Sequence, residues 1–289
     1  MDHRSETRDF LTTRRARLTP QQAGLPVYGG NRRVAGLRRE EVALLAGVSV
    51  DYYTRLERGN LAGVSEGVLE ALVRALQLDD AERIHLFDLA RTANAGPATR
   101  RRTAGQRRIR PAVQRILDSM VGAPAWVRNG RLDFLAANTL GRALYAPMLS
   151  SVARPANSAR FTFLDPGSRD FYVDWDRTAG DIVAILRAQA GRYPYDQELT
   201  ALIGELSTRS DEFRVRWAAH DVKFHRTGNK RLRHPVVGDL DLQYEAMELI
   251  ADDGLTLLAY TAEPGSPTAD ALSLLASWTA RQPEINRQG

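Results

Sequence analysis

The sequence predicts an α+β protein, in which an all-α N-terminal bundle precedes a five-stranded antiparallel sheet with helices. Three observations predict this class. Residues 4 to about 91 show helical periodicity punctuated by Gly, Ser or Asp. An Asn-Gly pair at 129–130 separates two runs rich in β-forming residues. Three further strand patterns follow a second helical stretch.

Length and composition are typical of a globular chain with two domains. The chain has 289 residues, of which 43% are hydrophobic. No window approaches the roughly 18 consecutive apolar residues of a membrane helix, and MDHRSETRDF lacks the apolar core of a signal peptide. We therefore expect a cytoplasmic protein with no membrane partner. The absence of cysteine excludes disulfides and thiolate chemistry.

Charge is unevenly distributed along the chain. Residues 1–110 carry 20 basic and 13 acidic side chains, a balance of +7, whereas the remainder carries 20 basic and 22 acidic side chains, a balance of −2. Of the 40 cationic residues, 38 are arginine. Guanidinium groups suit phosphates and guanine edges, so the basic first half is the candidate for a polyanionic partner.

The segment REEVALLAG reads as a helix that ends at a glycine. Val42, Leu45 and Ala46 share one apolar stripe, and Ala43 is expected to point away from it. Gly47 can adopt the left-handed conformation that ends a helix, because it carries no Cβ. The chain is expected to turn there.

A second helix, VDYYTRLER, follows at once. Ser49 is placed to cap it. Helix, short turn with glycine, and helix with a polar face is the helix-turn-helix layout, whose second helix enters the DNA major groove. The residues expected to project from this helix are Val50, Asp51, Thr54, Arg55 and Arg58, with Tyr52 beside them.

Different side chains of this segment suit different parts of a DNA duplex. Arg55 can contact guanine O6 and N7, and Asp51 can accept from cytosine N4 or orient an arginine. Contacts to phosphates position a protein without reading sequence. The side chains better placed for phosphates are Arg38, Arg39, Arg58 and Tyr52.

Two later helices complete this predicted domain, residues 1–91. Ser65 can cap the first, and Asp79 with Glu82 resembles a capping box before the second. Residues 92–110 are dense in arginine and nearly free of large apolar side chains, which favours a solvated linker over a segment that contacts phosphates. The core side chains expected from the two helices are Val68, Leu72, Leu76, Ile84 and Phe87.

Residues 111–289 form the second predicted domain. Asn129-Gly130 predicts a hairpin with a type I′ turn, and helical periodicity returns between residues 138 and about 219. The later strand candidates are DVKFHR, DLDLQYEAMEL and LTLLAYTA. Together these elements predict a five-stranded antiparallel sheet with helices on one face, in an order consistent with a PAS-like sensor.

The segment GLRREEVALLAGVSVDYYTRLERG, followed by VLEALVRALQLDDAERIHLFDLA, resembles the XRE-type helix-turn-helix of bacterial regulators with an MmyB-like ligand-binding domain. The likeness continues through NSARFTFLDPGSRDFYVDW and KRLRHPVVGDLDLQYE to about residue 278. It implies a sequence-specific transcription regulator, usually dimeric, with a PAS-like sensor that in some members accommodates a fatty acid. The DNA contacts it implies are Arg38, Arg39, Ser49, Val50, Asp51, Tyr52 and Arg55.

A cavity for an apolar ligand needs aromatic and aliphatic walls and a few polar groups that orient the ligand's head. For each candidate residue, an ordinary role in the core or at the surface is the commoner outcome. The candidate wall residues are Trp126, Phe134, Phe161, Phe163, Trp175, Phe213, Trp217 and Tyr244. The candidates to pair with an acidic head group are Arg216, His220, Arg231 and His234.

Neither a cofactor nor a metal site is expected. If DVKFHR pairs with NKRLRHP through a turn at 227–229, His225 faces residue 230 or 232, roughly 7 to 13 Å along the strand from His234. That separation is too large for shared coordination, and zinc requires about four close ligands. The sequence also lacks a phosphate-cradling Gly-rich loop and HExxH, so we expect no enzyme.

Three functions remain open at this stage. The leading one is a homodimeric regulator of a double-stranded DNA operator that responds to a small apolar or acyl ligand, with half-sites about 10 base pairs apart. In the second, the C-terminal half is a dimerisation or protein-partner module without an effector. An apolar cavity of a few hundred Å³ would argue against that alternative. The third is an enzyme or redox sensor with a DNA-binding appendage.

Overall fold

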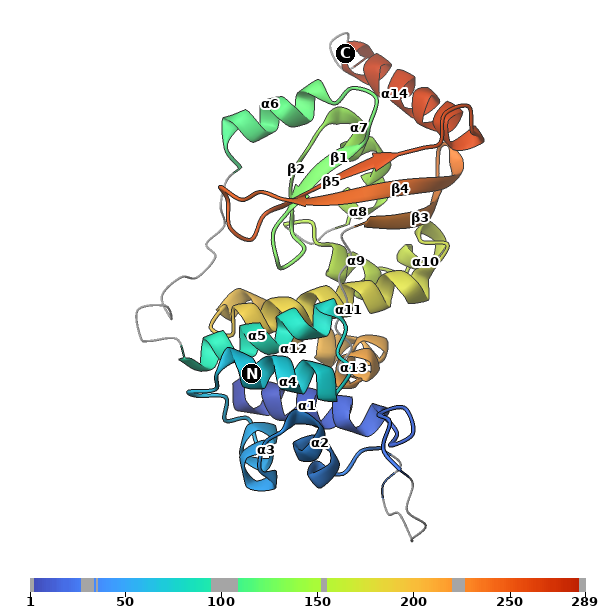
Figure 1. Cartoon of the computed structure of the whole chain (residues 1–289). Coiled ribbons are helices and arrows are strands. Elements are labelled where there is room, and N and C mark those ends of the chain that lie inside the picture. Colours follow the sequence, from blue (N-terminus) through green and yellow to red (C-terminus); the bar gives the residue numbers. More distant parts are fainter. Residues whose placement is uncertain are drawn as a thin grey trace. The chain divides into compact units, whose positions relative to one another are not determined.

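The chain forms two compact units, and each is described separately (Figure 1). The computed structural model describes residues 3–26, 34, 36–94, 109–151, 155–219 and 227–285. The described residues of the first unit lie within Met1–Thr103, Arg187–Ala201 and Arg216–Lys223. Those of the second unit lie within Ala104–Leu186, Leu202–Val215 and Phe224–Gly289.

The first unit contains the predicted N-terminal helical bundle. Its interior includes Phe10, Tyr53, Leu56 and Leu72, none of which is exposed to solvent. Ser65 caps the fourth helix by accepting from the Val68 N–H. The helices of the bundle are α1 (His3–Arg17), α2 (Arg39–Ala46), α3 (Val50–Glu57), α4 (Glu66–Ala75) and α5 (Asp80–Asn94).

Two expectations about this core were wrong. Ala43 is buried, because α2 packs against both α3 and α4 and so buries more than one stripe. Ile84 is 37% exposed, because α5 turns a neighbouring stripe inward. Val68 and Phe87 pack against the core only in part, whereas Leu72 and Leu76 are buried as expected. The buried stripe of α5 consists of Ala81, His85, Leu86, Leu89 and Ala90.

A buried ion pair joins α1 to the last part of α11 (Trp175–Arg192) within the first unit. The Arg187 guanidinium donates to the Glu6 carboxylate at 2.7 Å, and His85 Nε2 lies 3.7 Å from the same oxygen. Burial raises the pKa of Glu6, but contacts with His85 and Arg187 more than offset it and bring that pKa to about 2. The Glu6 carboxylate is therefore ionised at neutral pH.

The second unit contains the predicted five-stranded antiparallel sheet, with strand order β2-β1-β5-β4-β3. The predicted α+β class is therefore confirmed. Two of the three late strand patterns coincide with β4 and β5. The strands are β1 (Ala125–Arg128), β2 (Phe134–Ala137), β3 (Thr227–His234), β4 (Gly238–Glu248) and β5 (Thr256–Thr261).

The third late strand differs from its prediction. DVKFHR, residues 221–226, lies outside the described residues, and β3 contains the segment 227–229 that was expected to form a turn. β3 pairs with β4 from Thr227 opposite Glu245 to His234 opposite Gly238. The turn falls at 235–237 because Pro235 cannot donate to the ladder and Gly238 takes a φ of 78°.

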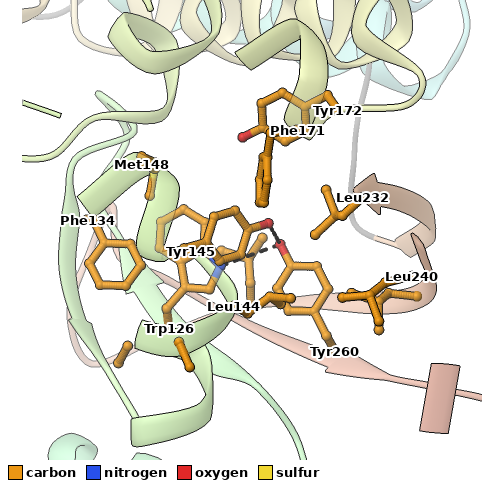
Figure 2. Close-up of a cluster of buried hydrophobic side chains, with 14 of the residues drawn as sticks. Trp126, Phe134, Leu144, Tyr145, Met148, Phe171, Tyr172, Leu232, Leu240 and Tyr260 are labelled. Atoms are coloured by element: carbon orange, nitrogen blue, oxygen red, sulfur yellow. Dashed lines mark hydrogen bonds between the residues drawn. The ribbon is translucent and has the colours of Figure 1, made fainter. Parts of the chain in front are cut away.

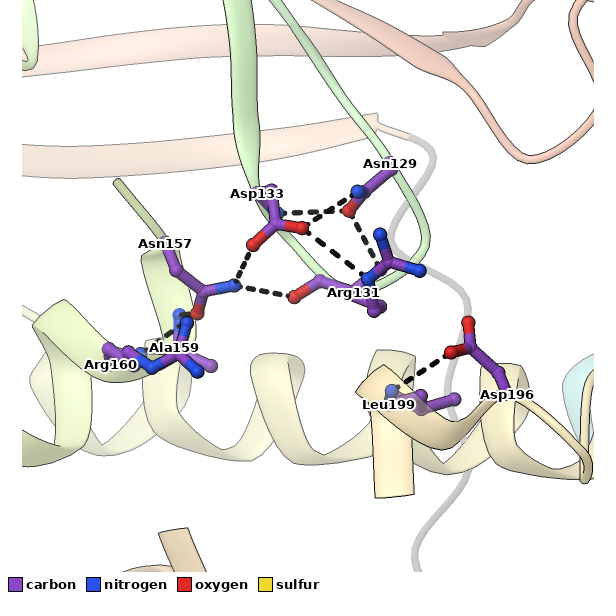
Figure 3. A network of polar contacts seen from close by, with 8 residues as sticks. All are labelled: Asn129, Arg131, Asp133, Asn157, Ala159, Arg160, Asp196 and Leu199. Carbon is purple, nitrogen blue, oxygen red and sulfur yellow. Dashed lines mark hydrogen bonds and ion pairs between the residues drawn. The ribbon is translucent and has the colours of Figure 1, made fainter. Parts of the chain in front are cut away.

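β1 and β2 form the predicted hairpin, but its turn is not the expected two-residue type I′ turn. Leu132, with φ of 69°, is the left-handed residue. The Asn129 side chain accepts from the N–H groups of Arg131 and Asp133 and sets a longer loop. Figure 3 shows how Asn157 donates to Asp133 at 2.8 Å and ties this loop to the start of α9 (Ser158–Leu164).

Helices cover both faces of the sheet in part, not one face as predicted. Val113 and Leu117 of α6 (Pro111–Ser119) pack against Val127 and Leu257 on one face. The other face carries the main core, which includes Trp126, Leu232, Leu242, Leu258 and Tyr260. The helices over that face are α7 (Thr139–Leu144), α8 (Ala146–Leu149), α9, α10 (Ser168–Phe171), α11 and α14 (Pro267–Ile285). The remaining helices are α12 (Gln197–Arg209) and α13 (Asp211–Ala218).

Candidate DNA-binding surface and ligand cavity

The turn between α2 and α3 has the predicted geometry. Gly47 takes φ 66° and ψ 34°, and its N–H bonds back to carbonyl groups of α2. The Ser49 hydroxyl accepts from the Tyr52 N–H at 3.1 Å and caps α3. Because both ends of the turn are defined locally, the direction of α3 relative to α2 follows from a few residues.

Close packing of α1 holds the far end of α3. Gly59 has a φ of 91°, and a Cβ there would lie 2.2 Å from the Arg4 carbonyl oxygen. Only glycine fits both the backbone conformation and this close approach. As a result, Arg4 of α1 lies beside the exposed face of α3.

The exposed face of α3 forms a shallow, charged depression of about 420 Å³. The Arg55 guanidinium lies over the Tyr52 ring, 4.7 Å from its centroid. Val50 is 45% exposed beside them, an apolar group that could contact a thymine methyl. The depression is lined by Arg4, Asp51, Thr54, Arg55, Arg58 and Asn60. Sequence reasoning did not name Arg4 or Asn60, since neither belongs to the helix-turn-helix pattern.

The two arginines at the start of α2 differ in their partners. Arg38 is exposed, and its side chain lies 3.3 Å from Glu40. Arg39 donates to the buried carboxylate of Glu57, which also accepts from Arg15. Arg39 therefore has a structural partner, although half of its side chain is exposed.

A cavity lies over the inner face of the sheet in the second unit, with a volume of about 60 Å³. Four strands, β1, β3, β4 and β5, and two helices, α9 and α11, contribute to its walls. The Tyr145 and Tyr260 hydroxyls share a hydrogen bond of 2.7 Å, and Trp126 Nε1 donates to the same Tyr260 oxygen (Figure 2). The lining residues are Trp126, Arg128, Leu132, Tyr145, Ser158, Tyr172, Thr178, Asp181, Ile182, Ile185, Lys230, Tyr244, Leu258 and Tyr260.

Two cations in this lining were not anticipated from the sequence. Burial lowers the pKa of Arg128 to about 10, although the protonated form still predominates at neutral pH. Burial also lowers the pKa of Lys230, to about 8. The alternation of Lys230, Leu232 and His234 was a usable signal, because the other two members of that series are buried.

Of the eight aromatic candidates, only Trp126 and Tyr244 line the cavity. Phe134 stacks on Trp126 with a centroid separation of 4.8 Å, and Phe161 packs against Phe171, so both act as core. The structure places the other candidates elsewhere. Phe163 contacts Trp175 and Phe213, and Trp217 lies under the Arg187 guanidinium.

The candidates for an acidic head group do not gather at the cavity. Arg231 is exposed and forms a two-pronged ion pair with Asp174 at 2.9 and 2.6 Å. His234 Nε2 lies 3.1 Å from the Ala143 carbonyl oxygen, and burial lowers the pKa of this histidine. Arg216 is half-buried on α13, and His220 lies outside the described residues.

Comparison with known families assigns both parts of the chain. The model of the MmyB-like transcription regulator ligand binding domain matches residues 109–275. The chain belongs to the MmyB-like transcription regulators. In this MmyB-like regulator a helix-turn-helix domain model also matches residues 9–86, which include α2 and α3. A search of curated proteins finds no match to the regulator.

Two searches for other kinds of site were negative within the described part of this MmyB-like regulator. No described helix combines the length and apolar character needed to cross a membrane. In the same residues, no three His, Asp or Glu side chains gather where they could hold a metal ion.

Proposed function

We propose that this MmyB-like regulator binds an operator in double-stranded DNA through α3 and changes its operator affinity when the C-terminal domain binds a small ligand. The observation that carries this proposal is the exposed face of α3, where Arg55, Asp51 and Arg58 border one depression next to a capped turn. The matches to both family models support it.

Base reading is assigned to the side chains on α3. Arg55 is exposed and stacked on Tyr52, so its guanidinium is held near the helix surface yet remains available to a guanine. Val50 and Asp51 lie one turn earlier. Phosphate contacts are assigned to Arg38, Arg39, Arg58, Tyr52 and Ser49, with Arg4 as an addition from the structure. For Arg39, binding DNA would compete with Glu57.

Sensing is assigned to the C-terminal domain. The strand order β2-β1-β5-β4-β3 supports the likeness of this domain to a PAS fold. We propose an effector with an apolar or acyl part. Its apolar part would contact Trp126, Leu258, Ile182 and Ile185. Because the cavity of about 60 Å³ is smaller than such a ligand, part of its wall must move on binding.

We propose that a ligand in the cavity changes operator affinity by favouring one of two states of the regulator. The change in operator affinity equals the difference in ligand affinity between the two states.

The domain limits and the assembly complete the proposal. We place the XRE-type DNA-binding domain at 1–91, the Arg-rich linker at 92–110 and the sensor at 111–289, which the family matches at 9–86 and 109–275 support. Most of the linker lies outside the described residues. We propose a homodimer on a roughly palindromic operator, a target consistent with the cytoplasmic location expected from the sequence.

The test is selection of binding sites for the full chain from random double-stranded DNA, followed by native mass spectrometry of the chain alone and on the selected site. We expect one enriched motif with two half-sites about 10 base pairs apart and a protein dimer on it. Recovery of random sequence, or of a single half-site bound by a monomer, contradicts the proposal.

A second candidate function is favoured by one observation. The cavity volume of about 60 Å³ is close to that of a packed core, as expected for a C-terminal dimerisation or partner-protein module without an effector. Denaturing extraction of the purified protein separates the two. A stoichiometric apolar or acyl compound supports sensing, whereas a ligand-free dimer that no small molecule displaces from the operator supports the second function.

A further inference from the structure

Lys230 is an exception in a chain that uses arginine for nearly all of its basic side chains. Of 40 such residues 38 are arginine, and the two lysines are Lys223 and Lys230. A guanidinium group stays protonated in proteins, whereas an ammonium group can lose its proton and become a nucleophilic amine. Arginine supplies a permanent positive charge elsewhere in this chain, so the lysine at position 230 points to a chemistry that arginine cannot provide.

The side chain of Lys230 lines the cavity of the C-terminal domain. It is partly buried, and its ammonium lies 5.0 Å from the centroid of the Tyr172 ring. Among the described residues, none accepts a hydrogen bond from this ammonium or forms an ion pair with it within 4.0 Å. No described acceptor therefore has to be displaced before the nitrogen can react.

The surroundings of Lys230 favour the neutral amine. Burial, together with Arg128 and Arg177, lowers its pKa to about 8, while Asp181 acts in the opposite direction. At neutral pH about one tenth of the amine is then uncharged, compared with less than about one in a thousand for an ordinary lysine. Desolvation and neighbouring cations are two means by which proteins prepare a lysine for attack on a carbonyl carbon.

Tyr244 is placed beside Lys230 to transfer a proton. In the register of β3 with β4, Lys230 lies opposite Leu242, two residues from Tyr244. The side chains of Lys230 and Tyr244 are therefore diagonal neighbours on one face of the sheet. Burial raises the pKa of Tyr244 to about 12, so its hydroxyl keeps its proton at neutral pH. Gly228 lies directly opposite, and the absence of a side chain there leaves room beside the hydroxyl.

We infer that Lys230 is the attachment site of a small aldehyde, which enters the cavity and forms an imine with the side-chain nitrogen. The inference rests on the proposed function, because it presupposes that the C-terminal domain receives a small ligand, and it names the electrophilic class of that ligand. The cavity of about 60 Å³ suits a short-chain aldehyde. Its apolar part would lie against Trp126, Leu258 and Ile182.

The covalent step needs no oxidant, reductant or cofactor. The neutral amine of Lys230 attacks the carbonyl carbon, a C–N bond forms, and the carbonyl oxygen takes up the proton that leaves the nitrogen. Tyr244 then donates a proton to the new hydroxyl group, which leaves as water, and the nitrogen returns a proton to Tyr244 as the C=N bond forms. Aldehyde and amine thus give an imine and one water molecule, and hydrolysis reverses the reaction.

The test is reductive trapping of butanal by the full chain at neutral pH with sodium cyanoborohydride, followed by mass spectrometry of the intact chain and its proteolytic peptides. We expect a butyl group on Lys230, added at least about tenfold faster than on Lys223, because more of the amine is uncharged. The rate at Lys230 should level off as the butanal concentration rises, since the aldehyde binds before it reacts. In urea the two lysines should react at equal rates.

Two results of this experiment overturn the inference. One is equal rates at Lys223 and Lys230 in the folded chain. The other is a rate at Lys230 that rises linearly with the butanal concentration, as expected for an amine that reacts without a binding site. The peptide map distinguishes both lysines from the α-amino group, and it does not depend on the folding of any variant.

Three variants locate the effect. Lys230→Arg keeps the positive charge but cannot form an imine, so it should take up butanal only at Lys223 and the α-amino group. Lys223→Arg is the matched control and should trap butanal at Lys230 as the original chain does. Saturable uptake that is lost in Lys223→Arg and kept in Lys230→Arg overturns the assignment. Tyr244→Phe should slow trapping at Lys230 by at least about tenfold, and an unchanged rate overturns the role of Tyr244.

Operator binding is measured on the same samples, so the two proposals can fail separately. Selection of an operator without saturable trapping at Lys230 sinks the imine alone. Saturable trapping at Lys230 without operator binding sinks the proposed function alone.

Discussion

The exposed face of α3 and the cavity on the sheet both present arginine, but in opposite surroundings. Arg55 is exposed to solvent beside Tyr52. Its guanidinium is hydrated and can contact DNA with little loss of free energy. Arg128 lies in the interior, where burial lowers its pKa to about 10 and Tyr260, Tyr244 and Glu248 act in the opposite direction. The comparison teaches that the guanidinium of Arg55 is available to a partner without any change, whereas the guanidinium of Arg128 is enclosed by the protein.

Arg187 sharpens this comparison, because it is buried and has a counterion. Its guanidinium pairs with Glu6, donates to the Trp217 carbonyl oxygen and lies over the Trp217 ring. Three arginines of one chain thus represent an exposed charge, a buried charge in an ion pair and a buried charge with no ion pair within 4.0 Å among the described residues. We expect substitution of each arginine to change the free energy of unfolding with a different sign, or to change a different measured property.

The largest effect is expected for Arg187→Met. This change leaves the Glu6 carboxylate buried next to His85 alone, and we expect the free energy of unfolding to fall by about 3–5 kcal/mol. Urea unfolding measures it. The control is Arg209→Met, which breaks an exposed pair with Glu205 and should cost less than about 1 kcal/mol. A similar loss in both variants would remove the distinction between buried and exposed pairs.

The next effect concerns DNA. Arg55→Ala should weaken operator binding by about 1–3 kcal/mol and leave binding to random DNA nearly unchanged, because a base contact is lost. Arg38→Ala should weaken both and flatten the salt dependence, because a phosphate contact is lost. Fluorescence anisotropy with operator and random duplexes over a salt series measures both. Equal losses on the two duplexes for Arg55→Ala would contradict its role in base reading.

The pH dependence of stability should reflect Lys230. Its folded pKa of about 8 lies below the ordinary value of 10.5, so the unfolded chain binds more protons between these values. The contribution of Lys230 to stability therefore rises as pH rises from 8 to 10.5. Comparison of the unfolding free energies of the original chain and Lys230→Met isolates this contribution. A difference between the two unfolding free energies that stays constant from pH 8 to 10.5 would contradict the lowered pKa of Lys230.

The smallest effect is expected at the cap of α3. Ser49→Ala removes the acceptor for the Tyr52 N–H and should lower the free energy of unfolding by about 1 kcal/mol. Ser49→Asp is the control, because aspartate caps a helix equally well. Thermal unfolding measures both variants, and an alanine variant as stable as the aspartate variant would show that the cap contributes nothing.

Local features of the first unit could be predicted because their causes lie within a few residues. Gly47 ends α2 and Ser49 caps α3 where the sequence indicates, and Asp79 with Glu82 forms the predicted capping box. The stripe of α5 was misassigned at Ile84, since the buried side of a helix depends on which neighbours pack against it.

The cavity was not predicted from the sequence, although the alternation of Lys230, Leu232 and His234 indicated that Lys230 shares a face with two buried residues. Arg128 ends a short strand, and Lys230 stands in the charged run KRLRH, so both resemble solvent-facing positions. The candidates that were named, Arg231 and His234, have the right chemistry but other partners. Strand alternation shows which residues share a face, but it does not show which face the helices cover.

The sequence by itself determined the helix-turn-helix, the α+β class, four of the five strands and the family resemblance, because turns, caps and periodicity act over short distances. Only the tertiary structure decided the place of β3, the covering of both sheet faces, the burial of Arg128 and the partial burial of Lys230. Those features depend on α6, α11 and β4, which meet the affected residues across long stretches of chain. A charged side chain on a strand is exposed to solvent unless another element packs over it.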